Sequence, residues 1–391
     1  MVIAAVPPGP RRIVIVTDAW HPQTNGVVRT LESVRDRLRA EGRAVLVVGP
    51  DITGTIPCPR YPEIRLAIAP GRRMRQLIDG FRPEAIHVAT EGPLGLAARS
   101  LCRRRGWRFT TSWHTQFPLY LRRYTGIPTG VSYAWLRRFH ASAAATLVPT
   151  RSVKDQLDAR GFRNVRVWTR GVDTSLFGAV PPVELDLPRP ICLSCGRVAV
   201  EKNIEAFLEA DLPGSKLVVG DGPARPALER RYPDATWVGF KYGRELASYY
   251  AASDVFVFPS RTDTFGVVMI EAMASGLPVA AHPVTGPVDV VREGVSGALD
   301  EDLAAAVRRA LEIPRESARR ASTVFTWERA AEIMLDTMVP VDAEADERIT
   351  ARDGRPHRPR LAADPGAPTD GGTAEDRTER DAGTASEPAV A

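Results

Sequence analysis

The fold of this chain is decided by IVIVTDAWHPQTNGVVRTLESVRDRLRAEGRAVLVVG, residues 13–49. The stretch begins and ends on short, nearly continuous apolar runs, which are typical of β-strands covered on both faces. Between these runs, residues 27–42 repeat apolar side chains at helical spacing and end on Gly42, a favourable residue for terminating a helix. A strand, a helix and a second strand in this order predict a parallel sheet.

The same alternation of strand and helix patterns continues along the chain. Further apolar runs of strand length lie at 84–89, 108–113, 145–150, 165–168, 191–195, 216–220, 235–239, 254–258 and 277–281. Residues 178–190 interrupt the alternation with a proline-rich stretch that has no periodicity. We therefore predict an α/β protein with two Rossmann-like, doubly wound domains that face each other across a cleft.

The domain limits follow from these patterns. We expect a first Rossmann-like domain over 11–177, a linker over 178–190, a second Rossmann-like domain over 191–314 and closing helices over 315–340. Residues 341–391 contain no Phe, Tyr or Trp and are rich in charged and small residues. Such a composition buries too little apolar surface to offset the entropy of ordering, so we expect a disordered tail.

Composition and charge narrow the class of protein. The chain has 391 residues, and no apolar run approaches the roughly 18 residues needed to cross a bilayer, so we expect a cytoplasmic protein. Residues 1–170 carry 28 Lys and Arg against 11 Asp and Glu, although the whole chain has a formal charge of only +5. This asymmetry indicates either an anionic partner of the first half or simply solvated basic helix faces.

Several familiar cofactor and metal signatures are missing from the sequence. No Gly-Lys pair occurs, which excludes a P-loop, and no G-x-G-x-x-G turn follows the first strand. The D-x-D formed by Asp300 and Asp302 begins a helical run, and we expect Asp300 to cap that helix. Cys192 and Cys195 fit one face of a buried strand better than a metal site. We expect no metal and no cofactor.

Two cations follow the first strand of the second predicted domain. Arg197 and Lys202 lie in the loop that enters the next helix, at the carboxyl end of a parallel strand, where ligands bind in doubly wound folds. The chain has only four lysines among 52 basic residues, so a lysine at this position is suggestive. These cations suit the binding of a diphosphate leaving group; a surface salt bridge is the structural alternative.

A second group of candidates lies in SRTDTFGVVMIEAMASG, residues 260–276. Asp263 and Thr264 can cap a helix in this segment. That helix is expected to begin near Phe265 and Gly266, where free N–H groups would form an anion site. The segment therefore predicts contacts with the phosphates of a nucleotide.

Glu271 lies farther along the same predicted helix, between apolar neighbours. An unpaired carboxylate in such surroundings is costly, so we expect a ligand group such as a ribose diol to bind it. Asp263 would meet the sugar of the same ligand. Taken singly, each acid is more often structural, but together with Arg197 and Lys202 they favour a nucleotide-sugar site.

These features together resemble glycosyltransferase family 4, a retaining family of the GT-B fold. The resemblance covers about residues 11–338 and rests on PQTNGVVRTLESV (22–34), TSWHTQFPLYL (111–121), RGVDTSLF (170–177), GRVAVEKN (196–203), VGDGP (219–223), SDVFVFPS (253–260) and the pair Asp263-x7-Glu271. It implies a hexosyltransferase that uses a nucleotide-diphosphate sugar. The chain looks most like bacterial glycolipid-forming and α-mannosyl transferases.

The resemblance also assigns roles to individual residues. It implies that Arg197 and Lys202 bind the donor diphosphate and that Glu271 binds the ribose. Asp263 would hold hydroxyls of the transferred sugar, although many members of the family have Glu at this position. Residues 284–291 also depart from the Gly-Gly and Pro-Glu pattern of many members.

His114 and Gly26 come from the first predicted domain. His114 follows an apolar run at its expected carboxyl end, where a histidine is either hydrogen-bonded structure or a catalytic group. The resemblance implies that His114 sits beside the anomeric carbon. It also implies that Gly26 lets the first loop approach the phosphates and the acceptor.

Three basic segments bear on the identity of the acceptor. Residues 70–81, 119–124 and 133–140 mix arginines with aromatic or aliphatic side chains. This pattern fits elements that lie on an anionic membrane, and it fits helices that pack their apolar residues inward. We expect a peripheral enzyme on the inner membrane face that glycosylates a lipid from GDP-mannose or a UDP-hexose.

Three other functions are compatible with parts of the sequence. A soluble acceptor would use the same chemistry, and a sugar-nucleotide epimerase would share the two-domain architecture. The Asp-x7-Glu pair and the basic loop favour transfer over epimerisation. A nucleic-acid-binding protein ranks last, because the basic residues form no recognised nucleic-acid motif, and we expect no nucleic-acid partner.

Overall fold

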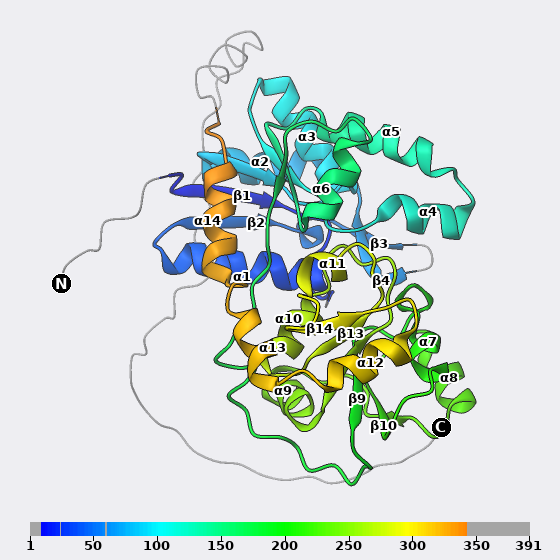
Figure 1. Ribbon diagram of the computed structural model, residues 1–391. Coiled ribbons are helices and arrows are strands. Elements are labelled where there is room, and N and C mark those ends of the chain that lie inside the picture. The colour runs from blue at the N-terminus through cyan, green and yellow to red at the C-terminus, as the bar shows by residue number, and fades with distance from the viewer. Residues whose placement is uncertain (1–8, 24, 59–60, 342–391) are drawn as a thin grey trace, which may run out of the picture. The chain divides into compact units, whose positions relative to one another are not determined.

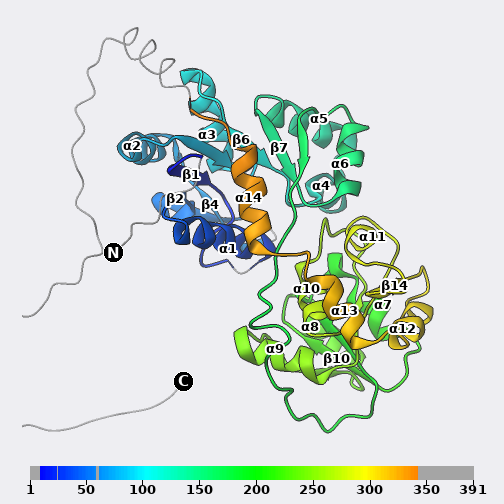
Figure 2. The ribbon, with the colours of Figure 1, turned by 60° about the vertical axis from the view of Figure 1, so that its left-hand side comes forward.

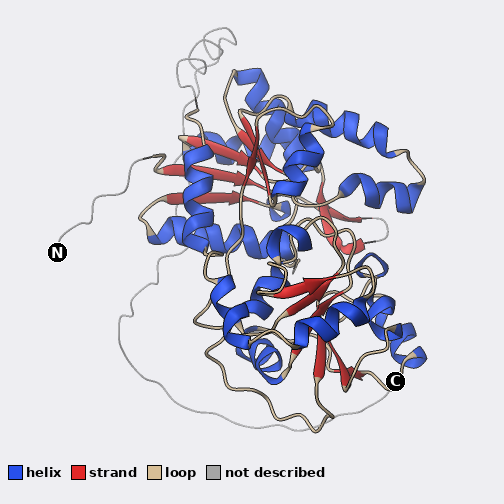
Figure 3. Cartoon of the chain, viewed as in Figure 1, coloured by secondary structure: helices blue, strands red, loops and turns tan. Residues whose placement is uncertain are grey.

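The computed structural model describes residues 9–23, 25–58 and 61–341, whose helices and strands are shown in Figure 1. The described strands form two six-stranded parallel sheets and one two-stranded antiparallel sheet (Figure 3). One parallel sheet comes from strands before residue 168, and the other comes from strands after residue 190. The prediction of two Rossmann-like units in an α/β protein is confirmed.

The first parallel sheet has the strand order β2-β1-β5-β6-β7-β8. Its strands are β1 (Arg12–Val16), β2 (Ala44–Val48), β5 (Ala85–Val88), β6 (Thr110–Ser112), β7 (Ala145–Val148) and β8 (Val165–Val167). Its helices are α1 (Gly26–Ala40), α2 (Gly71–Phe81), α3 (Pro93–Arg105), α4 (Phe117–Thr125), α5 (Thr129–His140) and α6 (Arg151–Asp158). The direction of winding reverses between β1 and β5, which makes the carboxyl ends of these strands a ligand position.

Strand β1 shows why helices cover both faces of the sheet. Ile13 and Ile15 pack with α1 on one face, and Val14 and Val16 pack with α2 and α3 on the other. All four side chains are fully buried. Because successive side chains of a strand point to opposite faces, a continuous apolar run needs a helical layer on each side.

The second parallel sheet has the strand order β11-β10-β9-β12-β13-β14. Its strands are β9 (Ile191–Cys195), β10 (Ser215–Val219), β11 (Thr236–Trp237), β12 (Val255–Phe258), β13 (Val279–Ala281) and β14 (Gly297–Leu299). Its helices are α7 (Ile204–Glu209), α8 (Arg225–Arg231), α9 (Gly243–Ala252), α10 (Val267–Ala274), α11 (Pro287–Val290) and α12 (Leu303–Leu311). This order is that of the dinucleotide-binding Rossmann fold, with its switch point between β9 and β12.

The predicted closing helices contact different partners. Helix α13 (Arg315–Ser322) packs against α10, whereas α14 (Trp327–Thr337) packs against α1 of the first sheet (Figure 2). The indole N–H of Trp168 donates to the Ala330 carbonyl oxygen in α14 at 2.8 Å. The end of the described chain therefore returns to the first sheet. The limits predicted for the domains and the linker stay predictions.

The predicted tail lies almost entirely outside the described residues. Val341 is described, and its N–H donates to the Glu84 carbonyl oxygen at 2.8 Å. The described residues therefore include only the first residue of the predicted tail. None of the described helices combines the length and the apolarity that a bilayer crossing requires.

Some elements and faces differ from the sequence-based expectations. The antiparallel hairpin of β3 (Thr55–Cys58) and β4 (Tyr61–Ala67) was not expected, nor was strand β14. Cys192 packs on the α7 and α12 side of β9, whereas Cys195 packs on the α10 side. The expectation of one shared face is wrong, because residues three apart on a strand point to opposite faces.

Candidate active site

The loops that follow β9 and β12 meet at the switch point of the second sheet. Arg197 lies in the first loop, and Lys202 ends the short 3₁₀ helix η2 (Val200–Lys202) of the same loop. Asp263 lies in the loop after β12. Lys202 Nζ and Asp263 Oδ1 are 2.5 Å apart, so an ion pair joins the two loops. The structure therefore brings these two predicted site residues together where doubly wound folds bind ligands.

The carboxylate of Asp263 is only partly used by Lys202. Its other oxygen, Oδ2, is buried and forms no hydrogen bond with any described residue. A buried acceptor without a partner costs free energy, so a ligand hydroxyl is a favourable partner for Oδ2. Burial would lower the pKa of Lys202, but Asp263 and Tyr120 raise it above its ordinary value. The Lys202 ammonium therefore stays charged near neutral pH.

Tyr120 reaches this ion pair from α4 of the first sheet. It forms a side-chain hydrogen bond with Thr262, the neighbour of Asp263. Burial raises the pKa of Tyr120, and the Lys202 ammonium acts in the opposite direction. The Tyr120 hydroxyl is thus a neutral group beside the Lys202–Asp263 pair.

The predicted capping roles of Asp263 and Thr264 are wrong. Helix α10 begins at Val267, and no described side chain caps its first turn. Asp263 is instead held in its ion pair, and the Thr264 hydroxyl donates to the His114 carbonyl oxygen at 2.7 Å. Thr264 therefore ties the loop after β12 to the loop that carries His114.

Phe265 and Gly266 shape the loop through packing and backbone geometry. Gly266 has a φ of 82°, and a Cβ at this position would lie 2.9 Å from the Phe258 ring, so glycine is required. The Phe265 ring is buried and packs edge-to-face on Phe325. The predicted phosphate contacts of this segment therefore rest on backbone N–H groups at the start of α10.

Glu271 is buried in α10, and protein side chains already contact its carboxylate, for which the sequence suggested a ribose diol as partner. Arg29 Nη2, from α1 of the first sheet, lies 2.6 Å from Glu271 Oε1. The Tyr250 hydroxyl donates to Glu271 Oε2 at 3.2 Å. Burial raises the pKa of Glu271, whereas Arg29 and Tyr250 lower it. A ribose diol that binds this carboxylate must therefore share it with Arg29 or displace Arg29.

His114 follows β6 and is held by two side chains. Its Nε2 lies 2.8 Å from Ser112 Oγ, and its Nδ1 lies 3.4 Å from Arg170 Nη2. Burial and, to a smaller extent, Arg170 hold the pKa of His114 well below its ordinary value. The ring is therefore neutral near pH 7. Its carbonyl oxygen accepts a hydrogen bond from Thr264. Thr264 directly follows Asp263 in the sequence, so this bond connects His114 to the loop that carries Asp263.

Gly26 is the first residue of α1. Asn25 caps this helix by accepting from the Val27 and Val28 N–H groups at 3.0 and 3.1 Å. A Cβ added at Gly26 would meet no atom of the described chain within 4 Å. The fold itself therefore does not require glycine here, and the space beside Gly26 is open to a ligand.

Gly26→Ala separates folding from ligand approach. We expect an unchanged or slightly higher melting temperature, because alanine favours the helix over glycine. Sugar transfer should fall by roughly ten-fold, since a methyl group would displace the reacting groups if the loop approaches the donor. Thermal melting and transfer assays measure the two effects, and unchanged transfer would remove Gly26 from the site.

The D-x-D acids are occupied by local contacts. Asp302, not Asp300 as predicted, caps α12 by accepting from the Ala304 N–H at 2.9 Å. Asp300 accepts from the Asp302 N–H at 3.0 Å and pairs with Arg309 at 3.2 Å. The Asp302 carboxylate thus caps α12, and the Asp300 carboxylate pairs with a side chain of the same helix.

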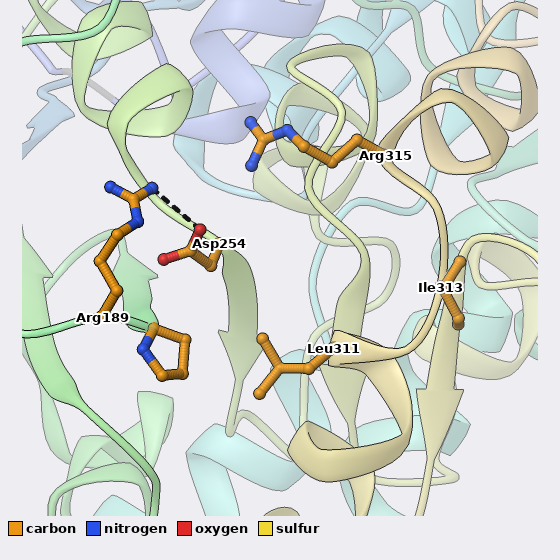
Figure 4. A pocket seen from close by; sticks show the side chains of 6 residues that line it. Arg189, Asp254, Leu311, Ile313 and Arg315 are labelled. Carbon is orange, nitrogen blue, oxygen red and sulfur yellow. Dashed lines mark hydrogen bonds and ion pairs between the residues drawn. The ribbon is translucent and has the colours of Figure 1, made fainter.

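A pocket of about 380 Å³ lies elsewhere on the second sheet (Figure 4). It is lined by Arg189, Pro190, Asp254, Leu311, Ile313 and Arg315. Pro190 and Asp254 directly precede β9 and β12, so this pocket lies at the amino ends of the strands. Lys202 and Asp263 follow the carboxyl ends of the same strands, where doubly wound folds bind ligands. The pocket is therefore separate from the candidate active site.

Four residues of this region were not predicted from the sequence: Arg29, Tyr120, Arg170 and Tyr250. Tyr120 and Arg170 lie in stretches that carry the family resemblance, and Arg29 lies three residues after Gly26. Their positions in or near these motifs were the sequence signal that could have identified these three residues as part of the site. Tyr250 lies in α9 without such a signal, and its role depends on the packing of α9 against α10.

Two family models match the chain. The model described as Glycosyltransferase Family 4 matches residues 24–176, and the model described as Glycosyl transferases group 1 matches residues 189–313. The first match covers the region of His114, and the second covers Lys202, Asp263 and Glu271. Together they cover the strands of both parallel sheets except β1.

Curated relatives agree with the family models. A GDP-mannose-dependent alpha-mannosyltransferase of Mycobacterium tuberculosis is 32% identical over 74% of this chain and 83% of its own length. A protein of the same name from Mycolicibacterium smegmatis is 33% identical over 81% of this chain and 94% of its own length. The alpha-monoglucosyldiacylglycerol synthase of Streptococcus pneumoniae is 26% identical over 77% of this chain and 78% of its own length.

Solved structures support the fold. Sucrose-phosphate synthase from Thermosynechococcus elongatus matches with a TM-score of 0.67 at 20% identity, over 83% of this chain and 97% of that chain. Anabaena Alr3699/HepE in complex with UDP and glucose matches with a TM-score of 0.62 at 14% identity, over 84% of this chain and 99% of that chain. With the family models and the mannosyltransferase relatives, these matches show that the chain belongs to glycosyltransferase family 4 and is a glycosyltransferase of the GT-B fold.

Proposed function

We propose that this glycosyltransferase moves a hexose from GDP-mannose or a UDP-hexose to a membrane lipid, with retention of configuration and without a metal. The observation that carries the proposal is the Lys202–Asp263 pair at the switch point of the second sheet. Asp263 Oδ2 is buried beside it without a partner in the described chain. A cation next to a carboxylate oxygen that lacks a partner suits a ligand that joins a charged diphosphate to a hydroxyl-rich sugar.

Five of the predicted site residues act through their side chains in this proposal. Lys202 and Arg197 bind the diphosphate and stabilise its charge as it leaves, with help from the N–H groups at the start of α10. Asp263 accepts a hydrogen bond from the sugar, and Glu271 accepts hydrogen bonds from the ribose. His114 lies beside the anomeric carbon as a neutral ring.

Retention requires the acceptor to attack from the face that the diphosphate leaves. The bond between the anomeric carbon and the diphosphate oxygen breaks, and a bond to the acceptor oxygen forms on the same side. The acceptor proton passes to the departing diphosphate. No nucleophilic side chain of the enzyme takes part in this step.

The names of the relatives support a lipid acceptor, and a transfer assay can test it directly. Their names include a GDP-mannose donor and a glucosyldiacylglycerol product. Purified protein with a panel of radiolabelled nucleotide sugars and a membrane extract should yield a labelled lipid. Label in a water-soluble product would favour a soluble acceptor, and conversion of the donor without any acceptor would favour an epimerase.

Metal independence is expected because both carboxylates of the D-x-D have local partners. We predict that enzyme treated with EDTA keeps most of its transfer activity. The measurement is the initial rate with and without EDTA, with added Mg²⁺ or Mn²⁺ as the control. Complete loss with EDTA, reversed by either metal, would contradict this part of the proposal.

Two surfaces of the first sheet's helices are candidates for membrane contact. In α2, Arg72, Arg73 and Arg75 are exposed, but Met74 and Ile78 are fully buried in the core. The apolar face predicted for residues 70–81 therefore packs inward, and α2 offers the membrane only its charges.

Helices α4 and α5 expose apolar side chains as well as charges. Residues 117–140 contain no Asp or Glu. Their exposed large apolar side chains are Phe117, Leu119, Ile127, Val131 and Trp135, and their exposed arginines are Arg122, Arg123, Arg137 and Arg138. Figure 1 shows α4 and α5 as neighbours, and they contact each other. This combination suits insertion into an anionic interface, and we assign the peripheral position of the enzyme to it.

The vesicle-binding prediction distinguishes the two surfaces. Replacing Arg72, Arg73 and Arg75 with Ser should weaken binding to anionic vesicles by tens-fold at low salt, since each arginine near the surface contributes on the order of 1 kcal/mol. Val131→Ser with Trp135→Ser should weaken binding at high salt too, because apolar burial is not screened. Flotation with vesicles at low and at high salt measures the binding of both variants. A wild-type protein that does not bind anionic vesicles at low salt would contradict the lipid-acceptor proposal.

A further inference from the structure

Arg170 is a buried cation beside the predicted catalytic histidine. It follows β8 at the start of the RGVDTSLF stretch and is only 3% exposed. Within the described part of the chain, no carboxylate forms an ion pair with it. Burial lowers its pKa to about 9, so the guanidinium remains charged at neutral pH. A buried charge is costly, so its retention in this position calls for a function.

The guanidinium of Arg170 is held in one orientation. Its Nη1 donates to the carbonyl oxygens of Trp168 and Thr169 at 2.7 and 3.2 Å, and it stacks over the Trp168 ring at 4.5 Å. The Trp168 indole is itself fixed by its hydrogen bond to Ala330 in α14. With Nη1 occupied, Nη2 lies 3.4 Å from His114 Nδ1.

The contacts of His114 determine which ring nitrogen carries the proton. A guanidinium has donors and no acceptor, so Nδ1 facing it must be the bare nitrogen. At 3.4 Å the contact is long for a hydrogen bond, but a proton on Nδ1 would also be repelled by the positive charge. The proton of the neutral ring therefore lies on Nε2, which donates to Ser112 Oγ at 2.8 Å.

The neighbours of Ser112 are consistent with this assignment. Ser112 Oγ lies 3.2 Å from the Ala89 carbonyl oxygen, to which its single proton is donated. Its oxygen then accepts from His114 Nε2 and from His87 Nε2, which is 3.1 Å away. His87 Nδ1 accepts from the Thr110 hydroxyl at 2.9 Å. In this arrangement every donor meets an acceptor.

We propose that Arg170 is a positioning residue that holds His114 in one neutral tautomer, with the proton on Nε2 and the bare Nδ1 toward the guanidinium. The functional consequence rests on the proposed function. Glycosyl transfer passes through a sugar with positive charge at the anomeric carbon, as in glycoside hydrolysis. A neutral ring beside that carbon avoids the repulsion that an imidazolium would add.

The titratable groups that act on His114 are Arg170, from the segment after β8, and His87, from β5. His87 is itself held neutral, since burial lowers its pKa to about 3. Burial opposes protonation of His114 most strongly, and the positive charge of Arg170 acts in the same direction. Wild-type His114 should therefore show no titration between pH 5 and 8, and removal of Arg170 should weaken the preference for one tautomer.

The test compares wild type with Arg170→Met and Arg170→Lys. Long-range ¹⁵N–¹H correlation spectra of the imidazole rings report the tautomer, with His114→Gln used to assign the signal. Wild type should show a protonated Nε2 and a bare Nδ1 at every pH from 5 to 8. Arg170→Met should show a mixture of tautomers and a kcat lower by roughly ten-fold, with a smaller change in the KM for the donor. Arg170→Lys should restore the single tautomer.

The wild-type spectrum tests the proposal even if Arg170→Met does not fold. A protonated Nδ1 or an imidazolium in wild type above pH 5 would overturn it. A folded Arg170→Met protein with an unchanged tautomer and unchanged kcat would also overturn it. The spectra do not depend on sugar transfer, so the expected tautomer in a protein without transferase activity would refute the proposed function alone.

Discussion

Lys202→Ala is expected to lower the rate of sugar transfer by at least about 100-fold at saturating donor, as the loss of one preorganised charge contact commonly does. Lys202 is the partner of Asp263 at the switch point of the second sheet. Its ammonium would offset the negative charge that develops on the diphosphate as the glycosidic bond breaks. Arg197→Ala should have an effect of similar size, because Arg197 lies in the same loop after β9.

Lys154 offers a matched control for Lys202. Both lysines have a side chain that is 28% exposed and an ion pair with an aspartate, but Lys154 lies on α6 and pairs with Asp158. Lys154→Ala should leave transfer unchanged. The rates are measured with radiolabelled donor, and folding is checked by thermal melting. Near-wild-type turnover of folded Lys202→Ala and Arg197→Ala would refute the assignment of the diphosphate site.

Asp263→Asn is expected to lower transfer by about 100-fold or more, because hydrogen bonds to a charged acceptor that strengthen in the transition state contribute on this scale. The substitution keeps the shape of the side chain but removes the charge that pairs with Lys202. Asp263 Oδ2, the buried oxygen without a described partner, is the atom proposed to accept from the sugar. Asp263→Glu should retain measurable activity, since many family members have Glu here.

Asp254→Asn is the control for this experiment. Asp254 also pairs with a basic residue, Arg189, at 2.9 Å, but it precedes β12 whereas Asp263 follows it. Its replacement should change stability more than transfer. If folded Asp263→Asn transfers sugar as fast as Asp254→Asn, Asp263 does not contact the sugar.

The fold was predictable because its determinants are local. The runs IVIV of β1 and VFVF of β12 are continuously apolar, and the run of β9 is interrupted only by Ser194. Only a sheet covered on both faces buries such strands. The positions of Arg197 and Lys202 followed from the same pattern, since a loop after a parallel strand lies at the ligand end of the sheet. The hairpin of β3 and β4 lacked such a pattern, because edge strands in small antiparallel pairs need little burial.

The contacts within the site were less predictable because they depend on side chains far apart in the sequence. Glu271 was expected to find its partner in a bound ribose, yet Arg29 from α1 already pairs with it. The start of α10 was placed too early, because the left-handed Gly266 delays the helix to Val267. Thr264 was then available for the His114 carbonyl oxygen, a contact between residues 150 positions apart.

The most direct test of the central account is transfer from a radiolabelled nucleotide sugar to extracted membrane lipid, followed by NMR of the product's anomeric proton. The account predicts that the wild-type protein forms a glycolipid with the anomeric configuration of the donor, and that Asp263→Asn forms at most traces of it. An inverted product would contradict the retaining mechanism. The absence of transfer from every nucleotide sugar in the panel, with folded protein and intact lipid, would contradict the account as a whole.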